Sequence, residues 1–170
     1  MAERAGGAVE NRFAGLVGTA RVEADAAARG LAVRIVERPA AGSLAEAAAL
    51  LGLEPSGIVK TLVVKRHDGD FLFALVPGGR KISWPKLRTL VGVNKLQLPA
   101  PEVALEATGY ERGTITPFGS AQEWPVYADE TIVGREVALG AGAHGYSAFV
   151  SADALISSFG AVVADITEPE

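Results

Sequence analysis

Lys60 is the residue whose surroundings point most directly to chemistry. It lies inside the otherwise apolar run from Ile58 to Val64, whose β-branched residues predict a strand. Burying an unpaired ammonium group is costly because the group loses its hydration. Lys60 therefore either extends along the solvent-facing side of the strand or enters a pocket, where it would hold an anionic or carbonyl oxygen. The strand pattern leaves both interpretations open.

Two glycine-containing segments could present backbone N–H groups to a ligand. The first, 113–119, has glycine at both ends and a proline inside, a composition that fits a rigid loop able to form an oxyanion hole. The second, 140–145, is rich enough in glycine for a ligand to approach its backbone. It lacks the spacing of a Walker or Rossmann phosphate loop. Either segment could equally be a plain turn.

The supply of other reactive side chains is small. The chain has no cysteine and two histidines, which excludes disulfides, a cysteine nucleophile and a multi-histidine metal site. His67 falls in an expected hairpin turn, whereas His144 could donate to a substrate or simply be exposed. A small esterase that uses a serine or threonine with His144 is a further alternative; Ser147 and Ser151 lie nearby in the sequence, although neither stands in a nucleophile-elbow pattern.

Charge is distributed unevenly along the chain. The net charge is −4, yet the segment 60–95 holds eight basic and two acidic residues, giving +6 there and −10 elsewhere. Such a segment could contact phosphates locally or form an ordinary solvated face. Asp129 and Glu130 are adjacent and would point to opposite sides of a strand. We therefore expect a structural role for at least one of these carboxylates.

The composition favours one globular domain. The 170 residues are 49% hydrophobic, with a mean hydropathy of +0.24, which fits a compact core. No apolar stretch approaches the roughly 20 residues that span a bilayer, and the first residues lack the pattern of a signal peptide. We expect a cytoplasmic protein with no membrane contact.

Short strands alternating with helices are expected to position Lys60 and the two glycine-containing segments. Residues 1–18 are expected to form a flexible tail and 19–170 a single domain of mixed α/β (α+β) class. Thr19, Ser43, Ser83 and Ser151 are expected to cap helices. The expected helices are 19–29, 43–51, 83–91, 101–109 and 151–159. The expected strands are 31–37, 58–65, 71–76, 95–98, 125–128, 136–139, 146–150 and 162–166.

The order of these pieces resembles the YbaK/ProX family, free-standing relatives of the editing domain inserted in bacterial prolyl-tRNA synthetases. The resemblance covers roughly residues 20–167. It rests on Val59–Leu62, Pro77–Leu87, Val91–Lys95, Ala107–Tyr110 and Gly113–Gly119, with Pro125, Asp129, Gly142, Gly145 and Ala164–Ile166. It implies a compact domain with a largely mixed β-sheet packed with helices.

The resemblance also implies an activity, which is deacylation in trans of mischarged tRNA, with Cys- or Ala-tRNA(Pro) as the model substrates. The implied partners are the tRNA acceptor 3′ end and prolyl-tRNA synthetase, with no cofactor and no metal. The implied catalytic residues are Lys60, Gly113, Thr116, Pro117 and Gly119. The implied substrate-binding residues are Thr61, Phe118, Asp129, Gly142, His144 and Gly145. The alternative is a non-catalytic module that binds a tRNA 3′ end, a nucleotide or a protein partner.

This sequence departs from the family pattern at two positions. Thr114 stands where the family often has a second glycine, so its side chain could change the shape of the loop or the size of the pocket. The position of His144 is commonly basic in some relatives, which leaves the role of this histidine open. Because no triad is evident, we expect the substrate's own 2′-hydroxyl or amino-acid side chain to assist the attacking water.

Overall fold

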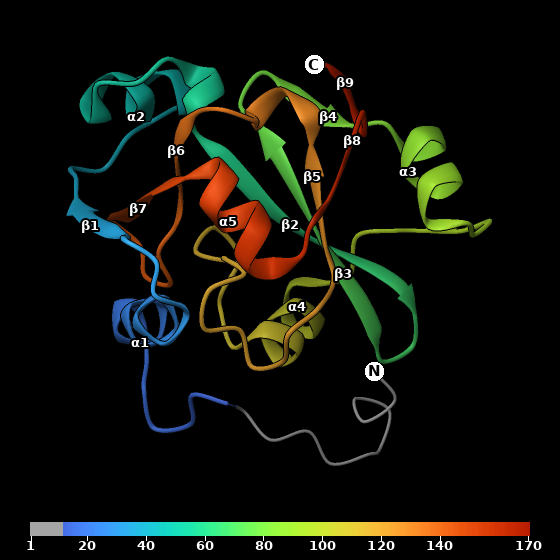
Figure 1. Cartoon of the computed structure of the whole chain (residues 1–170), viewed down its shortest axis with the longest axis horizontal. Coiled ribbons are helices and arrows are strands. Elements are labelled where there is room, and N and C mark those ends of the chain that lie inside the picture. The colour runs from blue at the N-terminus through green and yellow to red at the C-terminus, as the bar shows by residue number, and fades with distance from the viewer. Residues whose placement is uncertain (1–11) are drawn as a thin grey trace.

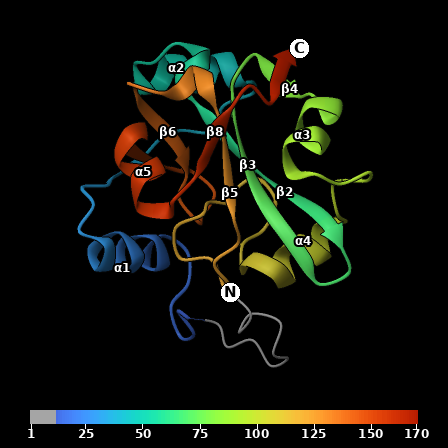
Figure 2. The same ribbon diagram turned by 45° about the vertical axis from the view of Figure 1, so that its right-hand side comes forward.

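The chain folds into a mixed α/β arrangement, seen in a computed structural model that describes residues 12–170 (Figures 1 and 2). Residues 1–11 of the expected tail lie outside this described part. Residues 12–18 form turns, and Arg12 donates hydrogen bonds to Glu123 and to the carbonyl of Ser120. The beginning of the described chain is thus attached to the domain. None of the helices in residues 12–170 has the length and apolarity needed to cross a membrane.

All five expected helices are present. They are α1 (Thr19–Arg29), α2 (Leu44–Leu51), α3 (Trp84–Val91), α4 (Pro101–Thr108) and α5 (Ala152–Phe159), with short 3-10 turns η2 (Pro55–Gly57) and η3 (Glu130–Ile132). Ser43 and Ser151 accept hydrogen bonds from the backbone N–H groups of Glu46 and Ala154, as expected of caps. Thr19 and Ser83 do not cap: Gly18 precedes α1, and no side chain caps α1 or α3.

The strands divide among three sheets. They are β1 (Arg34–Glu37), β2 (Val59–His67), β3 (Asp70–Pro77), β4 (Arg80–Ile82), β5 (Val126–Asp129), β6 (Glu136–Gly140), β7 (Tyr146–Ser151), β8 (Val162–Ala164) and β9 (Thr167–Pro169). A mixed sheet has the order β2-β3-β5-β8, an antiparallel sheet has the order β1-β7-β6, and β4 pairs with β9. The mixed α/β class is confirmed, with the mixed sheet accompanied by two smaller antiparallel ones.

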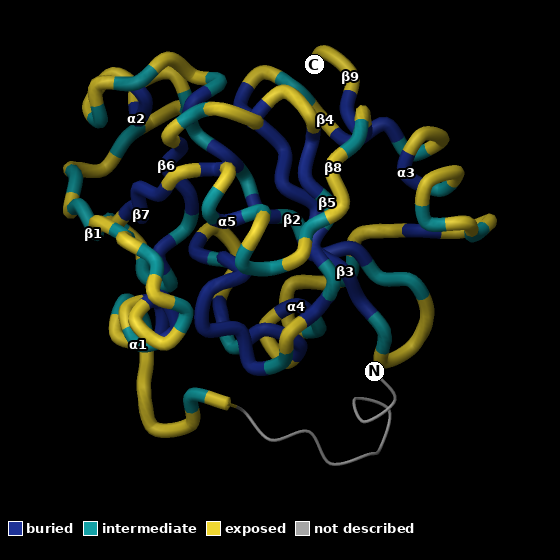
Figure 3. The backbone as a smooth tube through the Cα atoms, in the orientation of Figure 1, coloured by how far each residue is buried: buried dark blue, intermediate teal, exposed yellow. Residues whose placement is uncertain are grey.

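Hydrophobic cores lie on both sides of the mixed sheet, and the apolar side chains of β2 alternate between them. Val59 and Val63 pack into the larger core with α1, α4 and α5, whereas Val64 packs into the smaller core with Leu87 of α3. Figure 3 shows β3 and β5 as the buried centre of the domain. Since side chains alternate along a strand, Lys60 falls on the side of the smaller core and Thr61 on the side of the larger one.

Several short elements differ from expectation. The expected strand 95–98 is reduced to one bridge between Gln97 and Lys65 of β2. The expected last strand, 162–166, ends at Ala164 as β8, and β9 follows outside the expected range and pairs with β4; the sequence pattern indicated neither β4 nor β9. The β2–β3 hairpin forms as expected, with His67 opposite Asp70. These short strands depend on partners distant in the sequence, so local patterns identify them poorly.

Candidate active site

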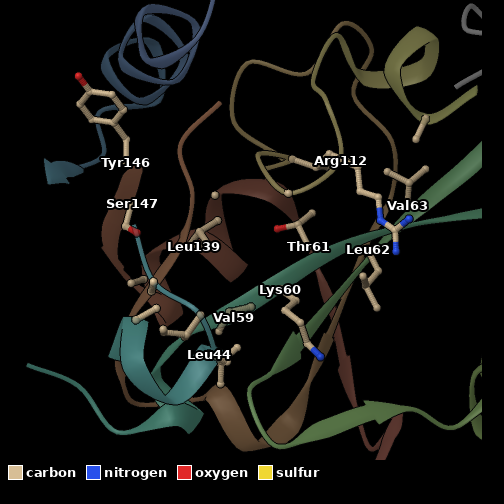
Figure 4. Close-up of a pocket in the computed structure, with 18 of the residues that line it drawn as sticks. Leu44, Val59, Lys60, Thr61, Leu62, Val63, Arg112, Leu139, Tyr146 and Ser147 are labelled. Atoms are coloured by element: carbon tan, nitrogen blue, oxygen red, sulfur yellow. The ribbon is translucent and has the colours of Figure 1, made fainter. Parts of the chain in front are cut away.

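A pocket of about 740 Å³ lies along the outer edge of β2 (Figure 4). β2 is the outermost strand of its sheet, and its outer edge is bridged at Ile58 and at Lys65. Between these bridges the pocket receives side chains from both faces of β2. Its other walls come from the start of α2, the segment 98–104, the loop 112–115 and parts of β6 and β7.

Lys60 and Thr61 line this pocket from opposite sides of β2 (Figure 4). The Lys60 side chain is 35% exposed, and its ammonium group donates a hydrogen bond to the carbonyl of Arg80 at 3.4 Å. It also lies 3.6 Å from the carboxylate of Glu170. The hydroxyl of Thr61 is buried and has no hydrogen-bond partner among residues 12–170. The Lys60 ammonium is therefore accessible to a ligand, whereas the Thr61 hydroxyl is unpaired within the described residues but covered, and it reaches a ligand only when a neighbouring group moves aside.

The start of the first glycine loop also reaches the pocket, through Gly113 and Ile115. Gly113 has a φ of 91°, which strongly favours glycine. Thr114, by contrast, is buried, and its hydroxyl donates to the carbonyl of Glu111 at 2.8 Å. Its side chain is absent from the pocket wall, so this departure from the family pattern does not narrow the pocket.

The remainder of the loop is built into the core. Thr116, Pro117, Phe118 and Gly119 are buried and do not line the pocket. Phe118 packs edge-on against Phe159. The structure therefore places Phe118 in a packing position, away from any substrate in the pocket.

Gly119 is held by two charged side chains of α1. Its carbonyl accepts hydrogen bonds from Nε and Nη2 of Arg21 at 2.9 and 2.6 Å, and its N–H donates to Asp25 at 2.8 Å. Tyr110 donates to the neighbouring carbonyl of Phe118 at 2.6 Å. Burial raises the pKa of Tyr110 to about 12. This network fixes the end of the loop whose beginning faces the pocket.

The second glycine loop supports the pocket rim from outside. Gly142 donates its N–H to the carbonyl of Thr114 at 3.0 Å, and the carbonyl of Gly145 accepts from the Arg38 N–H at 2.9 Å. His144 is exposed, and its Nε2 lies 3.3 Å from the Glu111 carboxylate. The expected binding residues Gly142, His144 and Gly145 thus lie beside the pocket, whereas Gly140 lines it.

The esterase alternative lacks its nucleophile–base pair. The hydroxyl of Ser151 caps α5, and the described residues contain no hydrogen bond between His144 and Ser147. Ser147 does line the pocket, but the ring of His144 is engaged with Glu111. A hydroxyl nucleophile needs a base within hydrogen-bonding reach, and this arrangement does not supply one.

Asp129 lies away from the pocket in a buried hydrogen-bond network. Its carboxylate accepts from the N–H of Ile166, from the hydroxyl of Thr167 and from Thr131. Burial alone would raise the pKa of Asp129, but these hydrogen bonds outweigh it and lower the pKa below the ordinary value. The hydroxyl of Thr167 in turn accepts a hydrogen bond from Nε of Arg80. The backbone carbonyl of Arg80 accepts a hydrogen bond from the Lys60 ammonium. Asp129 therefore supports the Lys60 side of the pocket from a distance.

The pocket wall carries three cations and no carboxylate. Arg38, Lys60 and Arg112 line it, and no Asp, Glu or His of the described residues 12–170 does. Sequence reasoning missed Arg38 and Arg112; the position of Arg112 directly before the Gly113 loop was the available signal. Much of the basic segment 60–95 is paired elsewhere, through the ion pairs Lys65–Asp68, Arg66–Asp70 and Lys86–Asp165.

Known proteins match this chain over most of its length. The family profile of the aminoacyl-tRNA editing domain matches residues 38–157. A candidate Cys-tRNA(Pro)/Cys-tRNA(Cys) deacylase of Enterococcus faecalis is 30% identical over 121 residues, which are 71% of this chain and 74% of that protein. A proline–tRNA ligase of Trichlorobacter lovleyi is 35% identical over 97 residues, 57% of this chain and only 17% of the ligase.

A solved structure shows the same fold. The crystal structure of a candidate trans-editing enzyme for prolyl-tRNA synthetase superposes with a TM-score of 0.81 at 32% identity, covering 88% of this chain and 96% of that one. The resemblance found in the sequence is thereby confirmed. With a matched family profile over residues 38–157 and this shared architecture, the chain belongs to the aminoacyl-tRNA editing domain family.

Proposed function

We propose that this protein hydrolyses, in trans, the ester between a wrongly attached amino acid and tRNA, with Cys- or Ala-tRNA(Pro) as its substrates. The observation that carries the proposal is the pocket on the β2 edge, which is lined by Lys60, Thr61 and the Gly113 loop and, within residues 12–170, by no carboxylate. Membership of the editing family and the name of the Enterococcus faecalis relative support this assignment.

The reaction needs stabilisation of a negative oxygen. Water adds to the ester carbonyl carbon, the bond from that carbon to the tRNA 3′-oxygen breaks, and the 3′-oxygen takes a proton. The carbonyl oxygen becomes an oxyanion during this addition. We assign to that charge the N–H of Gly113 and the hydroxyl of Thr61 on one side of β2, and the long side chain of Lys60, which reaches in from the other side. The Gly113 N–H forms no hydrogen bond within residues 12–170.

The wall offers no general base of its own. Within residues 12–170 its ionisable side chains are those of Arg38, Lys60, Arg112 and Tyr146, with no carboxylate or imidazole among them. A proton acceptor for the attacking water must then come from the substrate or from solvent. The 2′-hydroxyl of the terminal adenosine or the side chain of the misattached amino acid fits this role, as expected from the sequence.

A panel of charged tRNAs tests the function. Purified protein is incubated with tRNA(Pro) carrying labelled cysteine, alanine or proline, and amino-acid release is compared with spontaneous hydrolysis. We expect accelerated release of cysteine or alanine and no acceleration for proline. If the protein binds these tRNAs but accelerates release from none of them, the deacylase is excluded and the non-catalytic binding module takes its place.

The partners follow from the same proposal. An editing enzyme that acts in trans meets its substrate after the synthetase has released it, so we propose mischarged tRNA as the primary partner, prolyl-tRNA synthetase as the secondary one, and the cytoplasm as the place of action. A pull-down with prolyl-tRNA synthetase, with and without tRNA(Pro), checks the second partner. Retention that depends on tRNA indicates an indirect association.

A further inference from the structure

Two arginines of the pocket wall have no role in the chemistry above. Arg38 follows β1, and Arg112 directly precedes Gly113. Arg112 is exposed and has no hydrogen bond or ion pair within the described residues, and its guanidinium lies over the Leu62–Val63 part of β2 (Figure 4). Arg38 is half-buried; its Nη1 donates to the carbonyl of Pro39 at 3.2 Å, while its buried Nε has no partner. Both side chains therefore keep donors for a ligand.

The acidic groups around these arginines contact other residues or are exposed. Glu111, beside Arg112, lies 3.3 Å from His144. Glu37, beside Arg38, is exposed on β1, and Glu170 lies against Lys60. The whole chain carries a net charge of −4, so a wall with three cations and no anion stands out against the rest of the molecule. Unpaired guanidinium groups in such a wall favour an anionic ligand.

We propose that Arg38 and Arg112 bind phosphodiester groups of the nucleotide strand whose 3′ end enters the pocket, leaving Lys60 to the ester. This inference rests on the proposed function and adds the group recognised at the rim. A guanidinium offers two parallel N–H donors that match phosphate oxygens, which a lysine ammonium does not. In Figure 4 the Arg112 guanidinium lies by Leu62 and Val63, whereas the Lys60 ammonium points away from Thr61 further along β2, so the two cations address different parts of one ligand.

The decisive experiment separates the phosphate from the ester. Wild type, Arg112→Ala, Arg112→Lys and Arg38→Ala are assayed on aminoacyl-tRNA and on the corresponding 3′-aminoacyl-adenosine, which carries no phosphate. Arg34→Ala is the matched control, because Arg34 is an exposed arginine of β1 that stacks on Phe149 and does not line the pocket. Thermal unfolding of each variant verifies that it is folded.

We expect Arg112→Ala to raise the KM for aminoacyl-tRNA about tenfold, the usual scale for one charged hydrogen bond, and to leave hydrolysis of aminoacyl-adenosine unchanged. Arg38→Ala should act in the same way, Arg112→Lys should restore part of the loss, and Arg34→Ala should match wild type. The dependence of log KM on log salt should weaken by about 0.7 for each arginine removed. Equal losses on both substrates, or no loss on tRNA, would overturn the phosphate site.

A binding measurement keeps this inference separate from the proposed function. Adenosine 5′-monophosphate and adenosine are titrated into the same proteins. Wild type should prefer the monophosphate, and Arg112→Ala should lose that preference. If wild type hydrolyses neither ester yet prefers the monophosphate, the deacylase fails while the phosphate site stands. If wild type hydrolyses the esters but shows no preference and no arginine dependence, the phosphate site fails alone.

Discussion

The two sides of the pocket are held in opposite ways. On one side, the loop that begins at Gly113 ends at Gly119, whose peptide group is fixed by Arg21 and Asp25 at 2.6 to 2.9 Å. On the other side, the Lys60 ammonium is partly exposed, with contacts of 3.4 Å and 3.6 Å. The loop side is buried and multiply bonded, whereas the Lys60 side is open and weakly bonded.

This difference assigns separate tasks to the two sides. Backbone donors stabilise a transition state best when they are already in place, since no free energy is then spent on reorganisation. A lysine on a flexible stem can instead follow the substrate into position. We therefore expect changes on the loop side to affect folding and catalysis together, and changes at Lys60 to affect catalysis alone.

Gly119→Ala should have the largest effect on stability. A methyl group there would lie 2.5 Å from the Tyr110 hydroxyl and 2.7 Å from the Arg21 carbonyl, at a φ of 71°. We expect a loss of about 3 kcal/mol in the free energy of unfolding, from overpacking and backbone strain, measured by urea denaturation. The matched control is Gly134→Ala, with a φ of 81° and open space around the methyl group, which should lose about 1 kcal/mol. Equal losses in the two variants would mean that the loop is not rigidly held.

Asp129→Asn should have an intermediate effect and sharpen the account of the Lys60 side. Its folded pKa lies below the ordinary value of 3.8, so its stabilisation is complete above that pH and is lost as the pH falls through the folded pKa. We expect the variant to lose about 1–2 kcal/mol at neutral pH and to show a flatter decline in stability below pH 4, measured by urea denaturation across pH. An acid limb as steep as that of wild type would show that another carboxylate is responsible.

Glu170→Gln should have the smallest effect. Glu170 is half-exposed and its contact with Lys60 is long, and such surface ion pairs contribute less than about 1 kcal/mol. We expect unfolding to change by under about 0.5 kcal/mol and the KM for aminoacyl-tRNA to fall by up to about twofold, because Lys60 loses a competing carboxylate. A large loss of turnover would instead mean that Glu170 orients Lys60 for the reaction.

The sequence predicted the local features of the site better than its assembly. The strand around Lys60, the caps at Ser43 and Ser151 and the β2–β3 hairpin follow from short-range patterns. That β2 would lie at the edge of its sheet does not, because strand order depends on pairing between distant segments. The same limit hid the pairing of β4 with β9, which brings Glu170 to Lys60.

The glycine motif 113–119 likewise predicted the loop, but it did not predict which residues of the loop face the pocket and which pack in the core. Gly113 faces the pocket, whereas Phe118 lies in the core. The cause is α1, whose Arg21 and Asp25 are almost fully buried and reach Gly119. Charged residues on a short helix are usually exposed, so nothing in the pattern of α1 indicated this contact. α1 also lies outside the matched family range 38–157.

The most direct test of the central claim is the turnover of Lys60→Ala on saturating mischarged tRNA(Pro), beside Lys65→Ala. Lys65 lies on the same strand, is paired with Asp68 and does not line the pocket. We predict that Lys60→Ala keeps the wild-type unfolding free energy and loses about 10²–10³-fold in kcat, while Lys65→Ala retains wild-type turnover. Wild-type kcat in a folded Lys60→Ala variant would contradict the assignment of this pocket as the site of deacylation.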